Sequence, residues 1–148
     1  MQATLAMDTD RNTPALSKAR LRTGRGLSGL LAFLLALDAL GKFLRPEPVV
    51  KGTLELGYPE SVIVPLGVVL LASVVLYALP RTALLGAILL TGYLGGAVAT
   101  HVRVGAGMFP ICFPIVFGVL LWGGLFLRDG RLRELIPLVR WSDARRRY

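Results

Sequence analysis

The sequence predicts an all-α integral membrane protein, a bundle of four helices that span the bilayer. Hydrophobic residues make up 54% of the 148 residues, and the mean hydropathy is +0.63, more than a water-facing surface normally allows. The apolar residues gather in four runs, each close to the roughly 20 helical residues that a bilayer core of about 30 Å requires. Charged residues flank these runs. Lipid is therefore the expected solvent for most of the chain.

The first predicted span covers residues 26–44 and follows a cluster of basic residues. It is longer than the apolar part of an ordinary secretory signal, contains Asp38, and is followed by no small-residue cleavage motif. We therefore expect it to be retained in the mature protein. The polar residues 1–23 before it are predicted to form a disordered cytoplasmic tail, so the four-span domain covers residues 24–129.

The second and third spans are predicted to form a tight antiparallel hairpin. Residues 45–60 contain three prolines and two glycines and are expected to be a loop with little regular structure. The second span then covers residues 61–79. Pro80 ends it, and Thr82 is a candidate N-cap for the third span, residues 82–100.

The fourth span covers residues 109–127 and completes an even number of crossings. The remaining residues 130–148 form a basic tail with a weak amphipathic pattern, suited to the cytoplasm or to the membrane interface. With this topology, 13 of the 17 lysines and arginines lie on the side that holds both termini, and 4 lie on the other side. Because basic residues are retained in the cytoplasm, both termini are predicted to be cytoplasmic.

Polar residues in the outer half of the membrane are the candidates for a binding site. Asp38 lies six residues before the outer end of the first span, or about 9 Å along a helix, and Lys42 is one turn away and can pair with it. Charges inside spans usually face the bundle interior, so we expect Asp38 to point inward. The other candidate ligand-binding residues belong to the third span: Tyr93, Thr100, His101 and Arg103.

Two interpretations of this polar cluster stay open. The cluster can be a pocket for a polar head group, a proton relay, or a site for a quinone-like ligand, with Glu55 or Glu60 reaching it from the loop. Alternatively, Asp38 forms a structural ion pair with Lys42 or Arg103, and the remaining polar residues extend to the interface. The sequence does not choose between them.

Small residues recur at four-residue spacing along the third span. They form two adjacent rows: Ala87, Thr91, Gly95 and Ala99 in one, and Gly92, Gly96 and Thr100 in the next. Such rows permit close approach of helix backbones in lipid. The third span is therefore predicted to be the central helix, and a substrate slot lined by these glycines is the alternative.

Several classes of function find no support in the residues. The net charge of +8 is explained by membrane topology, and the basic residues do not alternate with exposed aromatics as in a nucleic-acid groove. The single cysteine, Cys112, excludes an intrachain disulfide and is expected to pack. The single histidine has no metal-ligand spacing around it, so no metal site is predicted.

Four aromatic residues are expected to be interfacial anchors, because amphipathic rings favour the head-group level of the membrane. They are Tyr58, Tyr77, Trp122 and Trp141.

The chain resembles the DoxX-like family of small bacterial four-span membrane proteins. The resemblance is carried by ALDALGKF in the first span, LELGYPE before the second, LPRTALLGAILLTGYLGGAVATHVR across the hairpin, and FPIVFGVLLWGGLFLRDGRLRELIP through the fourth. It covers about residues 27–137 and implies a location in the bacterial cytoplasmic (inner) membrane. Relatives in the wider superfamily are associated with membrane oxidoreductase systems, including thiosulfate:quinone oxidoreductase subunits, and many members have no assigned reaction.

The resemblance transfers no proven catalytic residue. The matching polar positions are candidates only: Asp38, Lys42, Arg81, Thr82, His101, Arg103, Arg128 and Asp129. The leading hypothesis is an accessory or structural subunit of a membrane redox or stress-response system, paired with another membrane protein or with its own copies. The alternative is a quinone or lipid-like molecule bound in an outer-leaflet pocket near Asp38 and His101, and a small oligomeric transporter is a weaker third. Enzymatic activity is left undecided, and a quinone is the one cofactor considered.

Overall fold

The computed structural model describes residues 18–130 and residue 132. The described chain is helical and contains no strand. Its elements are α1 (Lys18–Leu44), α2 (Glu47–Glu55), η1 (Glu60–Val62), α3 (Ile63–Ala78), α4 (Ala83–Arg103) and α5 (Met108–Arg128). Four segments are long and apolar enough to cross a membrane: α1, η1 with α3, α4, and α5. The predicted fold class, an all-α membrane bundle, is confirmed.

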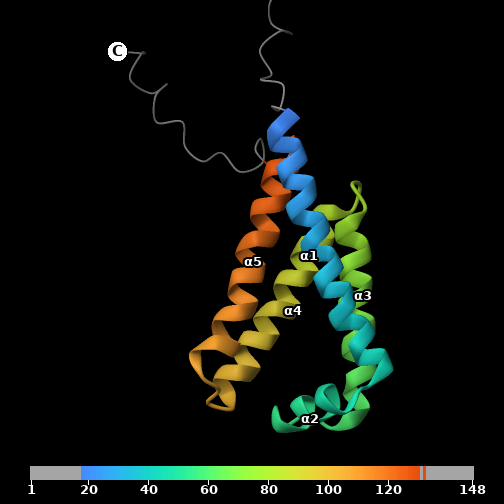
Figure 1. Ribbon diagram of the computed structural model, residues 1–148, viewed down its shortest axis with the longest axis vertical. Coiled ribbons are helices and arrows are strands. Elements are labelled where there is room, and N and C mark those ends of the chain that lie inside the picture. Colours follow the sequence, from blue (N-terminus) through green and yellow to red (C-terminus); the bar gives the residue numbers. More distant parts are fainter. Residues whose placement is uncertain (1–17, 131, 133–148) are drawn as a thin grey trace, which may run out of the picture.

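The four long helices form a ring in which α1 packs on α3, α3 on α4, α4 on α5, and α5 back on α1. Helices α1 and α4 are therefore diagonal partners with little direct contact. The α3–α4 connection lies at the same end as the start of α1 and the end of α5, and α2 lies at the opposite end (Figure 1). We call these the hairpin end and the α2 end. The described chain thus begins and ends on one side, while the cytoplasmic identity of that side stays a prediction.

The hairpin between α3 and α4 is as short as predicted. Helix α3 ends at Ala78, two residues before Pro80, and Thr82 is the N-cap residue of α4. The Thr82 hydroxyl does not cap an amide but donates to the carbonyl of Leu76 at 2.9 Å. One turn later, any Cβ added at Gly86 would collide with the backbone of Tyr77. The missing side chain at Gly86 therefore sets how closely the two helices approach.

Tyr77 is a buried hydrogen-bonding residue of the core and not an interfacial anchor as predicted. Its side chain is fully buried, and its hydroxyl donates to the carbonyl of Leu121 at 2.9 Å and lies 3.0 Å from the Ser28 hydroxyl. The guanidinium of Arg128 donates to the Tyr77 carbonyl at 2.6 Å and stacks over its ring. A tyrosine can be buried when its O–H finds a partner, and here α3, α1 and α5 meet around one ring.

The N-terminal boundary differs from the prediction. Helix α1 begins at Lys18, so residues 18–23, which were predicted to be disordered, are helical. The Thr23 hydroxyl satisfies the carbonyl of Ala19 one turn earlier. Residues 1–17 lie outside the described residues, as does nearly all of the predicted basic tail, including Trp141.

The segment 45–60 is not the irregular loop that its prolines suggested, because it contains the helix α2. Pro46 is the N-cap residue, and Pro48 falls in the first turn, where the missing N–H has no helical partner in any case. Gly57 then reverses the chain with a φ of 78°. The position of a proline within a helix, not the number of prolines, decides whether the helix forms.

The prediction that α4 is the central helix of the bundle is wrong for the single chain. Ala87 is buried, but Thr91, Gly92, Gly95, Gly96 and Ala99 are exposed. A Cβ built on any of the three glycines meets open space. The close approach at Gly86 instead turns the face with Leu90 and Leu94 inward. Both faces of α4 carry small residues, and periodicity alone does not tell which one packs.

The outer surface of the ring is apolar. Large hydrophobic side chains such as Phe33, Val119 and Phe109 are 60%, 67% and 78% exposed. Such an extent of exposed apolar area is unfavourable in water and favourable in a bilayer. Cys112, which was expected to pack, is also exposed.

Candidate functional site

Asp38 and Lys42 form the predicted pair on α1. The Nζ atom of Lys42 lies 2.6 Å from Oδ2 of Asp38, one helical turn away. The two side chains differ in access, because Lys42 is 15% exposed and Asp38 is 52% exposed. The stem of Lys42 packs on α3, where a Cβ at Gly67 would be 2.9 Å from the Lys42 Cβ. The Lys42 side chain is therefore largely covered, whereas the side chain of Asp38, expected to point inward, is half exposed.

Tyr93 lies on the diagonal helix α4, where it is partly buried and packs against the hydrophobic core. No hydrogen bond among the described residues joins it to Asp38 or Lys42, so the structure does not bring it to the ion pair. Helices α1 and α3 diverge from α4 and α5 toward the α2 end (Figure 1). We call Asp38 and Lys42 the polar site.

Thr100 and Arg103 form a second, separate group. The Tyr58 hydroxyl lies 2.8 Å from Oγ1 of Thr100. Arg103 donates to the Leu56 carbonyl at 2.6 Å and lies 5.9 Å from the centroid of the Tyr58 ring. These contacts fasten the segment after α2 to the end of α4, and we call them the loop clamp. The predicted single cluster is thus divided, because Thr100 and Arg103 are engaged by the loop.

His101 and Glu60 also have partners other than the polar site. Nδ1 of His101 lies 2.7 Å from the carbonyl of Ala97 in its own helix. Glu60 forms an ion pair with Arg45, which links the end of α1 to η1. Within residues 18–130, no group of three histidine, cysteine or acidic side chains is placed to hold a metal ion.

Sequence reasoning missed the partners that cross between helices. Tyr58 was expected to be an anchor, but it is part of the loop clamp, and Trp122 donates from α5 to the Thr91 hydroxyl on α4 at 2.9 Å. Neither contact has a local sequence signal, because each joins residues more than 30 positions apart. Only the rotation of each helix within the ring brings them together.

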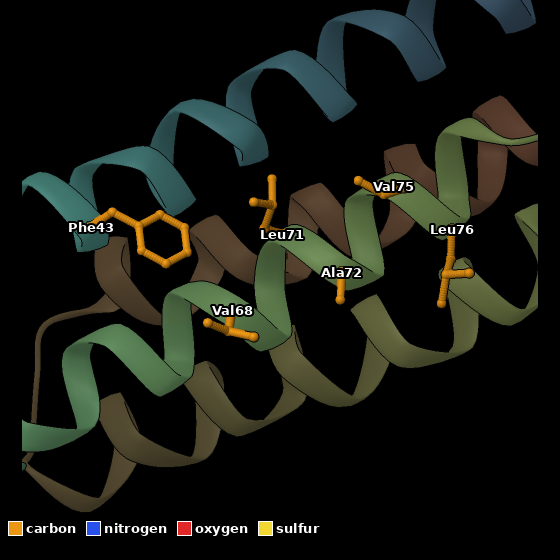
Figure 2. Close-up of a pocket in the computed structure, with 6 residues that line it drawn as sticks. All are labelled: Phe43, Val68, Leu71, Ala72, Val75 and Leu76. Carbon is orange, nitrogen blue, oxygen red and sulfur yellow. The ribbon is translucent and has the colours of Figure 1, made fainter.

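An apolar groove lies between the end of α1 and α3. It has a volume of about 480 Å³, and Figure 2 shows its walls, which are Phe43 of α1 and Val68, Leu71, Ala72, Val75 and Leu76 of α3. These side chains offer no hydrogen-bonding group. The groove suits hydrocarbon, and no residue of the polar site lines it.

The family model of the DoxX-like family matches residues 26–124, more than half of the chain. The chain belongs to the DoxX-like family. The match extends from α1 into α5 and includes the polar site and the loop clamp, so this DoxX-like protein is a multi-pass membrane protein. No curated protein and no solved structure matches the chain.

Proposed function

We propose that this DoxX-like protein binds the polar head group of a quinone or another lipid-like molecule at the polar site. The observation that carries the proposal is the half-exposed side chain of Asp38, about 9 Å from the α2 end of a spanning helix and paired with a lysine whose side chain is largely covered. A charged side chain in contact with hydrocarbon costs several kcal/mol. A polar occupant of the adjacent space removes that cost.

The chemistry of the site supports binding more than a reaction. A carboxylate and an ammonium provide an acceptor and donors next to each other on one helix face. His101, the other residue of the predicted pocket, contacts its own helix. We therefore propose that the head group binds at Asp38 and Lys42.

The proposal is tested by ligand binding to purified full-length protein in lipid nanodiscs. The probe is a benzoquinone with a short isoprenoid tail, offered in its oxidised and its reduced form. Asp38→Asn should weaken binding of the preferred form about tenfold, the value of one hydrogen bond to a charged group. Glu60→Gln is the matched control, because it removes the carboxylate charge from the other ion pair described here, and it should leave affinity unchanged.

Three results would count against this assignment. If the wild-type protein binds neither form of the probe, the proposed function is wrong. If Glu60→Gln weakens binding as much as Asp38→Asn, the effect is not local to the polar site. If Asp38→Asn yields no folded protein in detergent, while Glu60→Gln folds, the Asp38–Lys42 pair is structural.

A second candidate function is favoured by the exposed face of α4. Gly92, Gly95 and Gly96 face open space in the single chain, and small residues in spans are typical of helix–helix contacts. We propose for this face the role of an accessory subunit that pairs with another membrane protein of a redox or stress-response system. Affinity capture from native membranes should recover a stoichiometric partner, and Gly95→Leu should abolish that recovery. Recovery of homo-oligomers alone would contradict this role.

A further inference from the structure

The charged residues of the described chain are divided unequally between its two ends. At the α2 end, basic and acidic side chains balance each other: Lys42, Arg45, Lys51 and Arg103, with Asp38, Glu47, Glu55 and Glu60. At the hairpin end, basic side chains far outnumber acidic ones: Lys18, Arg20, Arg22, Arg25, Arg81 and Arg128, with Asp129. Among the described residues, the hairpin end therefore carries an excess of positive charge.

Arg25 and Arg81 lie near the place where α1 and α3 meet at the hairpin end. The Ser28 hydroxyl of α1 lies 3.0 Å from the Tyr77 hydroxyl of α3. Arg25 precedes Ser28 by about one turn, and Arg81 follows Tyr77 just beyond the end of α3. Both arginines are exposed, and neither takes part in an ion pair between described residues. Their guanidinium groups are therefore available to an anion from outside the chain.

The apolar groove lies in the half of the membrane that adjoins this basic end. The spanning segment is Glu60–Ala78, and the groove residues of α3 extend from its middle, at Val68, toward the hairpin, at Leu76. They cover about 12 Å of helix, most of the roughly 15 Å that one leaflet contributes to the hydrocarbon core. Phe43 and Val68 lie at one end of the groove and Leu76 at the other (Figure 2). The groove therefore suits a chain that enters from the hairpin-end leaflet.

Arg25 and Phe43 lie on the same face of α1. They are 18 residues apart in one helix, which corresponds to about five full turns. Gly29 and Ala36 lie between them on this face, and a Cβ built on Gly29 meets open space. A row of small side chains thus connects an unpaired cation at the hairpin end with the ring at the deep end of the groove.

From this arrangement we infer that the hairpin end binds an anionic phospholipid, with its phosphate at Arg25 and Arg81 and one acyl chain along the groove. Guanidinium groups are suited to phosphate because they donate two parallel hydrogen bonds to it. The groove offers no hydrogen-bonding group, so it suits hydrocarbon and not the backbone of an acidic peptide. None of these residues belongs to the polar site, so the inference does not depend on the proposed function.

The lipid preference is measured on the full-length protein in detergent micelles by native mass spectrometry. The two probes are phosphatidylglycerol and phosphatidylcholine with identical acyl chains. Phosphatidylglycerol should bind about tenfold more tightly, since each basic residue near the surface contributes a factor of about five toward an anionic lipid. Glycerol 3-phosphate, which has the charge but no chain, should not displace it at equal concentration. Equal binding of the two lipids, or displacement by glycerol 3-phosphate, overturns the inference.

Two charge variants test the position of the phosphate. Arg25→Gln and Arg81→Gln should each weaken phosphatidylglycerol binding about fivefold and lower its advantage over phosphatidylcholine. Lys51→Gln is the matched control, because it removes an exposed cation at the α2 end that forms no ion pair with a described residue. It should leave both affinities unchanged. An equal loss in Lys51→Gln overturns the placement at the hairpin end.

A substitution that keeps every charge tests the groove. Ala72 is an exposed residue of the groove wall, so Ala72→Leu fills space that the acyl chain would occupy. The variant should bind both lipids more weakly and keep their affinity ratio. Ala99→Leu makes the same change on the exposed face of α4 and should have no effect. Unchanged binding by Ala72→Leu overturns the groove as the chain site, and the wild-type lipid preference tests the inference even if a variant does not fold.

Discussion

At the scale of single residues, burial of polar atoms is what makes this bundle specific. Tyr77, Ser28 and Arg128 connect three helices through hydrogen bonds of 2.6 to 3.0 Å. In lipid, apolar side chains gain little by leaving one apolar surface for another, so packing and polar contacts decide how helices associate. Glycines at the contact points let the helix backbones come close enough for such packing, as at Gly86 beside Tyr77.

Two glycines of α4 should respond in opposite ways to the same substitution. Gly86→Ala places a Cβ against the backbone of Tyr77, which forces the hairpin apart, and should cost about 1–3 kcal/mol as in other overpacked cores. Gly92→Ala meets open space and should be neutral or stabilising by up to about 1 kcal/mol. Thermal unfolding of the purified protein in detergent measures both.

Equal destabilisation by Gly86→Ala and Gly92→Ala would contradict the orientation of α4 described above. If Gly92→Ala greatly lowered thermal stability in native membranes but not in detergent, a partner on that face of α4 would be indicated.

At the scale of elements, α2 is held in place by the turn that follows it. Gly57 adopts a positive φ of 78° beside the Arg103 side chain, and the loop clamp joins this turn to α4. Helix α2 itself buries no residue fully. The turn after α2, more than the helix, therefore fixes the segment over the α2 end of the bundle.

Gly57→Ala and Gly52→Ala form a matched pair that tests this role of the turn. Alanine at position 57 must adopt a left-handed conformation, which costs about 1–2 kcal/mol, so amide hydrogen exchange of α2 should become faster. Gly52 lies inside α2 with open space around it, so alanine there should slow exchange by stabilising the helix by about 0.5–1 kcal/mol. Faster exchange in both variants would show that α2 is held by contacts other than the turn.

At the scale of the whole molecule, an even number of spans places both ends of the described chain on one side. The hairpin connection with Arg81 shares that side, and α2 with Lys51 lies on the other (Figure 1). The distribution of basic residues predicts that the hairpin end is cytoplasmic. Both Lys51 and Arg81 are exposed and therefore accessible to a labelling reagent.

Cysteine labelling in intact cells tests the topology. In a Cys112→Ser background, Lys51→Cys should react with a membrane-impermeant maleimide from outside, and Arg81→Cys should react only after permeabilisation. The reversed pattern would contradict the cytoplasmic placement of the termini. Labelling of both positions from the same side would contradict the arrangement of four spans.

The sequence by itself determined the elements that depend on composition and local pairing. Four apolar runs of spanning length specify four spans because lipid requires every backbone polar group to be satisfied within its own helix. Pro80 and Thr82 predicted the position of the hairpin. The four-residue spacing of Asp38 and Lys42 predicted that the two side chains lie on one helix face. All of these depend on neighbours within about one turn of each other.

Only the tertiary structure decided which side of each helix faces its neighbours. The glycines of α4 were expected inside and lie outside, and Tyr77 was expected at the interface and lies in the core. Thr100 and Arg103 contact the loop and not Asp38. The physical reason is that a helix in lipid is apolar on nearly every face, so no hydrophobic periodicity marks the packed side. Close contacts such as Gly86 against Tyr77 fix each rotation, and they exist only in three dimensions.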